Sequence, residues 1–551
     1  MDFSCREFTW SNYKIHPHSK RTIHLFCASS SLFSNPNAFF YLLIPTIILW
    51  FVYFRMSRKR LYELAAQFQG PEGYPLAGSI HEFVGDPLKI FEKVWKLSHK
   101  YTKNGSPGKL WIGHRLIVFL SHPKDIEVIY GSQTHIYKSP EYGFFNSWLG
   151  SGVLISNGEK WRTLRKLIAP TFHLNVLRSF VDFFYIHSLS AVDKMKEEGS
   201  KEFDVHHYMG ACTTEILLET AMGVDKKTHH QVNGFEYASA VMKLCEIMHL
   251  RQVKLWLRSD RAFKLTSYAS CMPYNCFCDF FKVMKKKKAD FLKEKQTTME
   301  KCNTNSKEAE GSAQKFDAER NKREVTETVE GVSFGQSAGL KDDLDDDIGE
   351  KKRQPFLESL IENAANGGHD TTAAGSSFFL CMMGVRPDIQ EKVVEELEQI
   401  FGDSDRPCTF EDTLEMKYME RCIMETLRLY PPVPMTGREP QEEVKLKSTD
   451  LTIPAKCTVV IGIFKLHRDP HYYAFIPFSA GPRGCLGKSQ FAMLQLKVLL
   501  STVLRNYKIY SDVPQKDWKL QADIILKRAD GFRIRLEPRK MTPKPKGSNG
   551  F

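Results

Sequence analysis

Apolar residues recur along most of this chain at the spacing of helices, and a few short stretches alternate in the manner of strands. Three long stretches carry the helical spacing: 215–224, 389–401 and 419–427. Gly402 ends the second pattern and Pro431 ends the third, as expected of residues that stop helices. β-Branched and aromatic residues predict a hairpin over 109–121 and strands over 457–463 and 531–537. The pattern therefore predicts a mainly α fold with small β-sheets.

One apolar segment near the N-terminus differs from the others because it carries no charge. Residues 38–54 read AFFYLLIPTIILWFVYF, and as a helix they would extend about 26 Å, near the lower limit for crossing a bilayer. A basic run begins at Arg55, so the positive-inside rule places the rest of the chain in the cytosol. A cleaved signal peptide is less favoured, because the run starts late and its charges lie on the wrong side. A buried core helix is the other alternative.

The segment 38–54 is therefore predicted to be a transmembrane anchor. It follows an N-terminal extension, 1–37, to which the sequence assigns no function. A basic, proline-containing hinge follows at 55–75.

Composition narrows the class of protein. The 551 residues are 42% hydrophobic and 26% charged, which is enough apolar material for a large globular core. Residues 303–353 are poor in large apolar side chains and predict a mobile polar insertion, and 541–551 form a tail. The net charge of +12 suits anionic lipid or an acidic protein. We expect no nucleic-acid partner, because zinc-finger, RNA-binding and basic-zipper signatures are absent. The 13 cysteines form no disulfide framework and favour a reducing compartment.

The sharpest motif is FSAGPRGCLG, residues 478–487, which matches F-x-x-G-x-R-x-C-x-G at every fixed position. A cysteine thiolate is a ligand of haem iron, and a tight loop must present it, for which Gly481 provides backbone freedom. Arg483 can reach a haem propionate. Phe478 can shield the sulfur of Cys485 from water. The alternative, a buried cysteine in a glycine-rich loop, leaves the other fixed positions unexplained.

Two further motifs, together with the cysteine loop, make the chain resemble the cytochrome P-450 family. WRTLR resembles the family's W-x-x-x-R, which implies that Trp161 and Arg165 hydrogen-bond a haem propionate. ETLR resembles E-x-x-R, and its spacing of three places Glu425 and Arg428 on one helix face, where they can form a buried ion pair. Each motif alone is weak, since surface ion pairs and chance W-x-x-x-R matches are common. Their order along the chain favours the family.

A fourth motif, GGHDTT, resembles the oxygen-activation segment of the family's long central helix. The resemblance implies that Gly368 leaves room for dioxygen beside the helix. It also implies that Asp370 and Thr371 deliver protons as general acids. Taken alone, the two would be an exposed helix acid and a packed hydroxyl. Arg438, in PMTGR, lies where family members place another propionate contact.

The resemblance covers about residues 70–540 and is closest to family 4, the fatty-chain hydroxylases. Within family 4 it is closest to the insect branch that makes cuticular hydrocarbons, on stretches such as KLIAPTFHLNVL and on the polar insertion itself. It implies haem b, held by Cys485 in a haem domain over 76–540. It also implies oxidation of a long-chain lipid substrate, including oxidative decarbonylation of aldehydes. We expect the protein on the endoplasmic reticulum membrane, with its catalytic domain facing the cytosol.

The resemblance also implies the source of electrons. They would come from NADPH through NADPH–cytochrome reductase, with cytochrome b5 as a further donor. The docking face of that reductase is acidic in this family, which suits the basic chain.

The sequence departs from the family at two places, where segments are missing. SLIENAAN joins GGHDTT directly, so a substitute sequence begins the central helix, which we expect over 355–384. Gly367 stands where many family 4 members carry a glutamate that tethers haem covalently, so no tether is expected. HRDPHYY runs almost directly into AFIPFSAG, and the arginine that completes a Glu–Arg–Arg network is lost.

That loss would leave a buried Glu425 one partner short, at a cost of about 1–3 kcal/mol. The departures keep a second hypothesis open: a catalytically silent relative that acts as a binding or interaction protein.

Overall fold

The computed structural model describes residues 36–74, 77–83, 87–146, 152–172, 174–222, 234–270 and 368–539. The chain divides into two units, Met1–Ala66 and Gln67–Phe551. Most of the predicted extension, the polar insertion at 303–353 and the tail at 541–551 lie outside the described residues. The first half of the predicted central helix, 355–367, lies outside them too.

The first unit consists, as far as it is described, of α2 (Pro36–Ser57) and α3 (Lys59–Ala66). The apolar stretch 38–54 is therefore helical, as predicted. Side chains along its second half, among them Ile44, Leu49 and Trp50, are exposed. Among the helices that the structure describes, however, none is both long enough and apolar enough to cross a bilayer. The prediction that 38–54 spans a membrane is not supported, for that reason.

A four-stranded sheet in the second unit has the order β1-β2-β7-β4. Its strands are β1 (Gly108–Ile112), β2 (Arg115–Leu120), β4 (Thr436–Arg438) and β7 (Thr458–Ile461). β1 and β2 form the predicted hairpin, and β7 lies parallel to β2 with Val118 opposite Val459. β4 pairs antiparallel to β7, with Arg438 opposite Val459. The sheet therefore joins a hairpin near residue 110 to the segment that carries Arg438.

The remaining strands form three small sheets. Their bounds are β3 (Phe203–Asp204), β5 (Val444–Lys445), β6 (Thr452–Ile453), β8 (Tyr507–Tyr510), β9 (Leu520–Asp523), β10 (Ile525–Arg528) and β11 (Arg533–Pro538). β11 lies between β3 and β8, while β9 pairs with β10 and β5 with β6. The strands predicted at 457–463 and 531–537 are thus confirmed as β7 and β11.

Helices make up most of the described part of the second unit. The α-helices are α4 (Pro87–Tyr101), α5 (Pro123–Tyr130), α7 (Gly158–Ile168), α8 (Leu174–Arg178), α9 (Val181–Met195), α10 (His206–Met222), α12 (Gly234–Val253), α13 (Asp260–Lys264), α14 (Ser267–Ser270), α17 (Gly368–Val385), α18 (Pro387–Phe401), α19 (Phe410–Glu415), α20 (Lys417–Leu429), α21 (Ile463–Leu466) and α22 (Lys488–Asn506). Short 3-10 helices are η2 (Ile80–Phe83), η3 (Lys103–Gly105), η4 (Pro140–Phe145), η5 (Ala169–Phe172), η6 (Lys196–Glu198), η7 (Leu255–Leu257) and η9 (Gln515–Asp517). The predicted mainly α class with small β-sheets is confirmed.

Local sequence signals explain where several helices begin and end. Pro387 lies in the first turn of α18, and Gly402 ends that helix with a φ of +61°. Thr409 and Asp412 form a reciprocal capping box at the start of α19. α20 ends before Pro431, as predicted.

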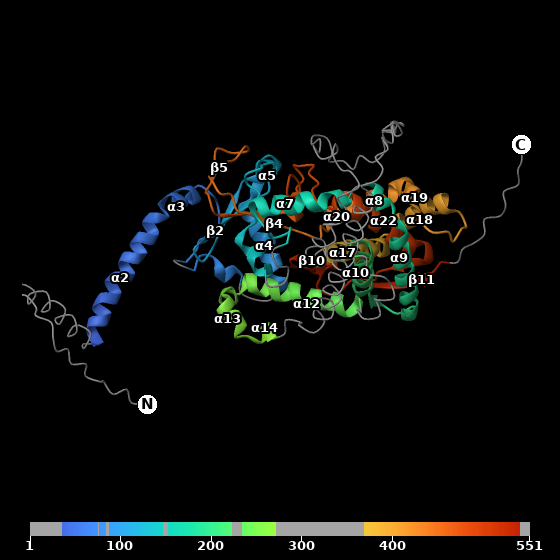
Figure 1. Cartoon of the computed structure of the whole chain (residues 1–551), viewed down its shortest axis with the longest axis horizontal. Coiled ribbons are helices and arrows are strands. Elements are labelled where there is room, and N and C mark those ends of the chain that lie inside the picture. The colour runs from blue at the N-terminus through green and yellow to red at the C-terminus, as the bar shows by residue number, and fades with distance from the viewer. Residues whose placement is uncertain are drawn as a thin grey trace, which may run out of the picture. The chain divides into compact units, whose positions relative to one another are not determined.

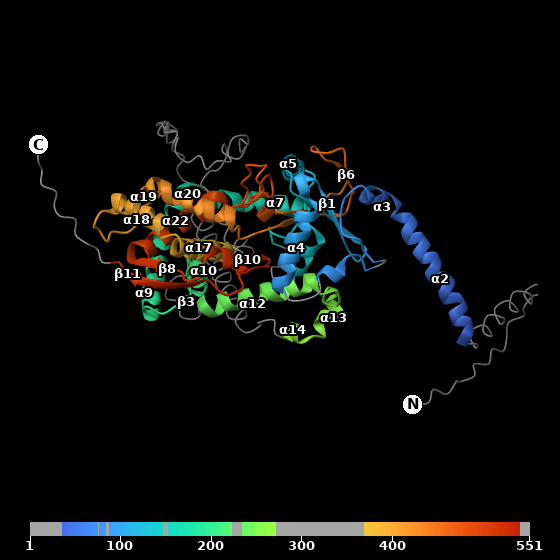
Figure 2. The same cartoon turned by 180° about the vertical axis from the view of Figure 1, so that it is seen from behind.

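α17 lies in the middle of the described helices, with α10 on one side and α20 and α22 on the other (Figures 1 and 2). Its side chains Phe378 and Leu380 are fully buried, as are Val498 and Leu499 of α22. Phe378 stacks on Tyr430 with ring centroids 4.6 Å apart. This apolar core fixes α20 and α22, the helices before and after the cysteine loop, relative to α17.

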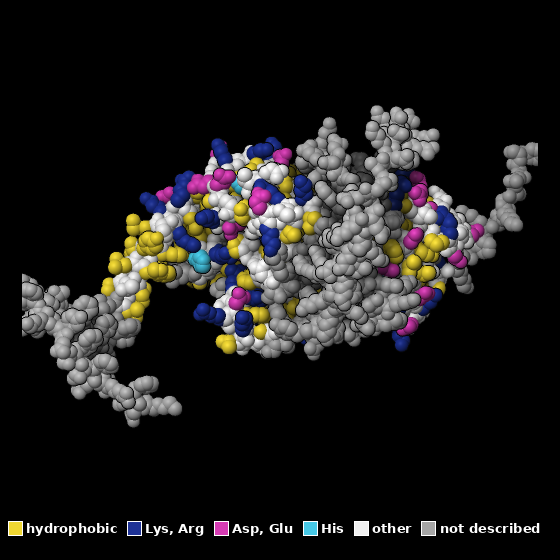
Figure 3. All heavy atoms as spheres, in the orientation of Figure 1, with side chains coloured by type: hydrophobic (Ala, Val, Ile, Leu, Met, Phe, Trp, Pro, Cys, Tyr) yellow, Lys and Arg dark blue, Asp and Glu magenta, His cyan; other side chains and the backbone are white. Residues whose placement is uncertain are grey.

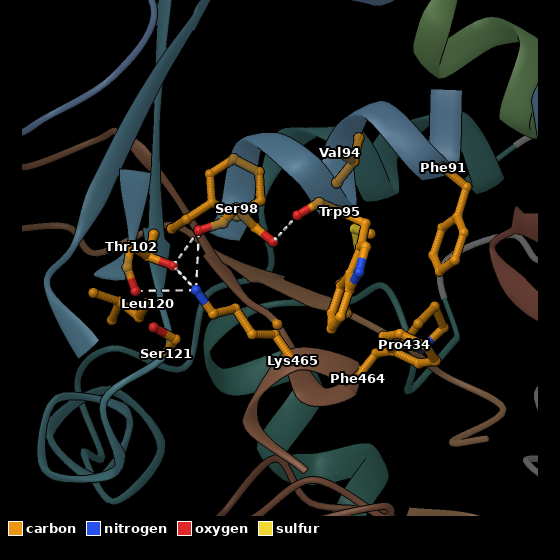
Figure 4. A pocket seen from close by; sticks show the side chains of 13 residues that line it. Phe91, Val94, Trp95, Ser98, Thr102, Leu120, Ser121, Pro434, Phe464 and Lys465 are labelled. Carbon is orange, nitrogen blue, oxygen red and sulfur yellow. Dashed lines mark hydrogen bonds between the residues drawn. The ribbon is translucent and has the colours of Figure 1, made fainter. Parts of the chain in front are cut away.

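Lys465 of α21 closes the C-terminal end of α4. Its Nζ donates to the carbonyl oxygens of Ser98 and Thr102 at 2.9 and 3.0 Å, and also to the Thr102 hydroxyl (Figure 4). A cation at a helix C-terminus opposes the helix dipole, and here it adds a charged donor to the Ser98 carbonyl, which also accepts from the Thr102 N–H. Burial lowers the pKa of Lys465. The ammonium therefore ties α21 to α4 beside a cavity of about 40 Å³.

Candidate active site

The loop of residues 478–487 is folded by its own main-chain hydrogen bonds. The Cys485 N–H donates to the carbonyl of Phe478 at 3.0 Å, and the Gly484 N–H donates to Gly481 at 2.9 Å. The Ser479 N–H closes the preceding turn by donating to Ile476 at 3.0 Å. The Cys485 side chain is exposed at the end of this loop. A sulfur held in this way can coordinate a group placed against the loop.

At Gly481 the loop packs closely against the C-terminal end of α5. A Cβ atom at this position would lie 1.7 Å from the carbonyl oxygen of Tyr130, and its φ of +69° is one that glycine adopts most easily. The sequence-based prediction that Gly481 is needed for backbone reasons is confirmed.

α7 supports the cysteine loop from a second direction. Arg165 donates from Nη1 to the carbonyl oxygen of Gly484 at 2.8 Å. Trp161, one turn earlier, is buried, and the guanidinium of Arg483 lies 4.7 Å from the centre of its ring. Trp161, Arg165 and Arg483 therefore lie together beside the loop, and their hydrogen bonds to a haem propionate stay a prediction. Arg165 contacts the loop backbone, a role that the sequence did not indicate.

Three cations converge beside this loop: Lys138, Arg438 and Arg483. Arg438, in β4, is 1% exposed and lies across the ring of Tyr130. Arg483 is buried and donates to the carbonyl of Ser156 at 2.8 Å. Burial lowers the pKa of Arg483 to about 9, helped by the nearby charge of Arg438. Burial also lowers the pKa of Lys138, and the charges of Arg438 and Arg483 lower it further. The cluster is therefore electrostatically strained by its own like charges.

This cluster fits the carboxylates of a haem. Within the described residues, no carboxylate forms an ion pair with any of the three cations. The Nε of Arg483 is buried and makes no hydrogen bond. An anionic group at this place would relieve the repulsion and satisfy that nitrogen. The same group would lie beside the exposed thiol of Cys485, so the donor set suits a porphyrin with propionate arms.

The Glu425–Arg428 pair forms as predicted, but it is not buried. Arg428 donates to both carboxylate oxygens of Glu425 at 2.7 Å. The Glu425 side chain is 54% exposed. Solvent can reach the carboxylate, so the predicted penalty for a buried Glu425 one partner short does not apply. Arg428 has another acceptor, the carbonyl oxygen of His467, at 2.8 Å.

The described part of the GGHDTT motif, from Gly368 on, opens α17, and its acid faces neighbouring helices. Gly368 begins the helix. The Cys245 thiol donates to Asp370 at 3.8 Å, and His206 Nε2 lies 3.9 Å from the same carboxylate. No hydrogen bond or ion pair within the described residues joins Asp370 to the cysteine loop. Proton delivery by Asp370 and Thr371 stays a prediction.

Two residues of the site, Lys138 and His467, belong to none of the motifs that the sequence carries. Lys138 lies in IYKSPEY, and a single basic residue in an apolar and aromatic segment is the only signal it offers. His467 is buried between α20 and the irregular segment before the cysteine loop. The pairing of residues far apart in sequence, which places both, is not visible in a motif.

The loop, the cation cluster and the helical fold define a haem-thiolate class of protein. The chain belongs to the cytochrome P-450 family, whose model matches residues 68–474 and 471–534. In this family a cysteine binds the haem iron, and its members are monooxygenases.

The chain is similar to several family 4 proteins over most of its length. It is 47% identical to cytochrome P-450 4g15 of Drosophila melanogaster, over 93% of this chain and 98% of that protein. It is 41% identical to cytochrome P-450 4g1 of Drosophila melanogaster, over 90% of this chain and 94% of that protein. Cytochrome P-450 4V2 of Pongo abelii is 30% identical over 85% of this chain and 88% of that protein. The expected resemblance to family 4 is confirmed at this level.

Proposed function

We propose that this protein is a haem-thiolate monooxygenase that oxidises long-chain aliphatic substrates, with Cys485 as the axial ligand of haem b. The observation that carries the proposal is the cluster of Lys138, Arg438 and Arg483, the last of which lies over Trp161, beside the loop that exposes Cys485. A cluster of like charges with no anion of its own needs a bound carboxylate, and the haem propionates supply two.

Different residues of this chain would bind the haem propionates and support the cysteine loop. Arg438, Arg483 and Lys138 would hold the propionates, with Trp161 beneath Arg483. Arg165 holds the loop backbone at Gly484. When haem is bound, the thiolate supplies electron density to the iron and favours cleavage of the O–O bond.

Other residues would shape the site or deliver protons. Phe478, half-buried against the apolar core, would shield the sulfur. Glu425 and Arg428 support the helix beneath the haem. Gly368 would make room for dioxygen, and Asp370 and Thr371 would deliver protons from α17.

The substrate class rests on the likeness to family 4. Fatty acids are one candidate, and long-chain aldehydes converted to hydrocarbons by oxidative decarbonylation are the other. NADPH–cytochrome reductase would supply the electrons, and cytochrome b5 is a further candidate. Arg162 and Lys166, which are one turn apart and exposed on α7, form a small basic surface that suits an acidic partner.

The protein would act at the endoplasmic reticulum membrane. α2 exposes a row of apolar side chains, which Figure 3 shows in yellow, and Arg55 and Lys59 follow them. Such a helix suits contact with a bilayer whose headgroups are anionic. Replacing Ile48, Leu49 and Trp50 with serine should release the protein from phosphatidylserine-containing vesicles in a flotation assay. Equal flotation of the variant and the unaltered protein would contradict this placement.

The decisive test is the difference spectrum of the reduced protein with carbon monoxide. A strongly red-shifted Soret band is expected for the full chain, and Cys485→Ser should abolish it. Cys422→Ser is the matched control, because Cys422 lies on α20 away from the cation cluster. Folded protein without the red-shifted band, or an unchanged band in Cys485→Ser, would overturn the proposal.

A second candidate is a haem-binding relative without turnover. The contacts that favour it are those of Asp370, whose carboxylate faces Cys245 and His206. Such a protein would show the red-shifted band but would not consume NADPH with a reductase and long-chain aldehydes or fatty acids. Substrate-dependent NADPH oxidation would exclude it.

A further inference from the structure

His467 connects the end of α20 to the segment that leads into the cysteine loop. Its Nδ1 lies 3.2 Å from the carbonyl oxygen of Arg428, the penultimate residue of α20. Its Nε2 accepts a hydrogen bond of 2.8 Å from the N–H of Ile476. The side chain is buried. One imidazole therefore bridges two main-chain groups from separate parts of the site.

The two partners fix the protonation state of the ring. A carbonyl oxygen only accepts, so Nδ1 must carry a proton and donate it to Arg428. A main-chain N–H only donates, so Nε2 must present a lone pair to Ile476. The neutral Nδ1–H tautomer alone satisfies both contacts.

The main chain of His467 is itself held from two sides. Arg428 donates from Nη1 to the His467 carbonyl at 2.8 Å. Arg428 and His467 are therefore joined by two hydrogen bonds, one in each direction. Lys465, two residues earlier, fastens α21 to the end of α4 (Figure 4). The main chain therefore holds the imidazole ring of His467 in one place.

Main-chain hydrogen bonds connect Ile476 to Cys485. The Ile476 carbonyl accepts from the Ser479 N–H at 3.0 Å and so closes the turn before the loop. Ser479 has a φ of +62°, which a free chain rarely adopts. The carbonyl of Phe478, inside that turn, accepts from the N–H of Cys485 at 3.0 Å. A displacement of Ile476 would therefore shift the turn and the cysteine together.

We propose that His467 is a positioning residue that sets the place of the Cys485 loop relative to α20, in a chain whose connection between them is short. The inference rests on the proposed function, because it takes Cys485 as the iron ligand. Its two ring nitrogens have separable roles: Nδ1–H anchors the ring to α20, and Nε2 holds the loop.

Two conservative variants separate these roles. In His467→Gln, the amide oxygen reaches the place of Nε2 and can still accept from Ile476. In His467→Asn, the shorter amide reaches only the place of Nδ1 and leaves the half-buried Ile476 N–H without its acceptor. An unsatisfied buried donor shifts an equilibrium about tenfold. We therefore expect the ratio of red-shifted to unshifted haem to fall about tenfold in His467→Asn. In His467→Gln it should stay within about twofold of the unaltered protein.

Gln390→Ala serves as the matched control for a general loss of stability. The Gln390 side chain is buried and bridges main-chain groups of Met383 and Ile509, away from the cysteine loop. Gln390→Ala should lower the unfolding midpoint and leave the ratio of red-shifted to unshifted haem unchanged. If His467 only stabilised the fold, the ratio of red-shifted to unshifted haem would follow the unfolding midpoint. The Asn and Gln variants would then show equal ratios whenever their unfolding midpoints are equal.

Amide hydrogen exchange of peptides covering 476–485 gives a second readout that does not depend on haem. His467→Asn should raise exchange in these peptides about tenfold, and His467→Gln should raise it much less. Equal exchange in the two variants would overturn the role of His467. An unchanged spectrum in Cys485→Ser would instead overturn the proposed function, so the two failures are distinguishable.

Discussion

Arg165 and Gly484 lie 319 positions apart in the sequence, and the guanidinium of Arg165 donates a 2.8 Å hydrogen bond to the Gly484 carbonyl. The contact fixes the residue before Cys485 to α7. It explains why a W-x-x-x-R motif and a cysteine motif, so distant along the chain, work as one site.

Arg165→Ala should therefore weaken haem retention, because the Gly484 carbonyl loses a charged donor, worth about 1–3 kcal/mol. Arg165→Lys should restore part of it, since a single ammonium lacks the planar fork of arginine. The rate of haem transfer to an excess of a haem-accepting protein measures the effect. Arg162→Ala is the control, because Arg162 lies exposed on α7 and bonds Glu159 and the Gln133 carbonyl, not the cysteine loop. Equal loss in both variants would contradict the role of Arg165.

Gly481→Ala should prevent normal folding of the site. The added Cβ would lie 1.7 Å from the Tyr130 carbonyl oxygen, a backbone atom that cannot easily move. Gly402→Ala has a similar positive φ but nothing within 4 Å of the added atom. It should cost only about 1–3 kcal/mol, for the backbone conformation alone. Urea unfolding compares the two, and similar midpoints would show that the Tyr130 contact does not matter.

Lys138→Met should have opposite effects on the haem-free and haem-bound protein. Without haem, Lys138→Met removes a charge that burial and the charges of Arg438 and Arg483 disfavour, so it should stabilise the fold. With haem, the same change removes a partner of the propionates and should speed haem loss. Unfolding midpoints and haem-loss rates measure the two effects. Destabilisation of both forms would contradict an unneutralised cluster.

Stability should depend on pH through His467. Burial lowers the pKa of His467 to about 4 in the folded protein, against 6.5 when unfolded. The folded state therefore resists protonation, and the contribution is fully present above pH 6.5 and lost as the pH falls toward 4. At pH 5 the loss should be about 2 kcal/mol. His467→Phe should lack this term, so its deficit against the unaltered protein should shrink between pH 7 and pH 5. Parallel pH profiles would contradict the prediction.

Glu425→Gln should cost no more than about 1 kcal/mol of folding stability, because the Glu425 carboxylate is more than half exposed and screened by water. Arg428→Gln should cost more, since Arg428 also donates to the His467 carbonyl. Urea unfolding of the two variants tests this order. A larger loss for Glu425→Gln would indicate a buried pair after all.

The sequence by itself determined the class of fold and the identity of the cysteine loop. Apolar periodicity placed α18, α20 and the β1–β2 hairpin, because helix and strand spacing are local properties that stop signals such as Gly402 delimit. The fixed positions of the loop identified Cys485 and Arg483, since a short motif carries its own backbone requirement.

Only the tertiary structure decided which of these residues meet. Lys138 joins Arg438 and Arg483, and His467 joins α20 to the loop, through contacts between segments hundreds or tens of residues apart. The exposure of Glu425 and the packing of Asp370 against Cys245 were likewise set by the neighbouring elements. A motif specifies residue types and spacing, whereas burial and charge depend on what packs around them.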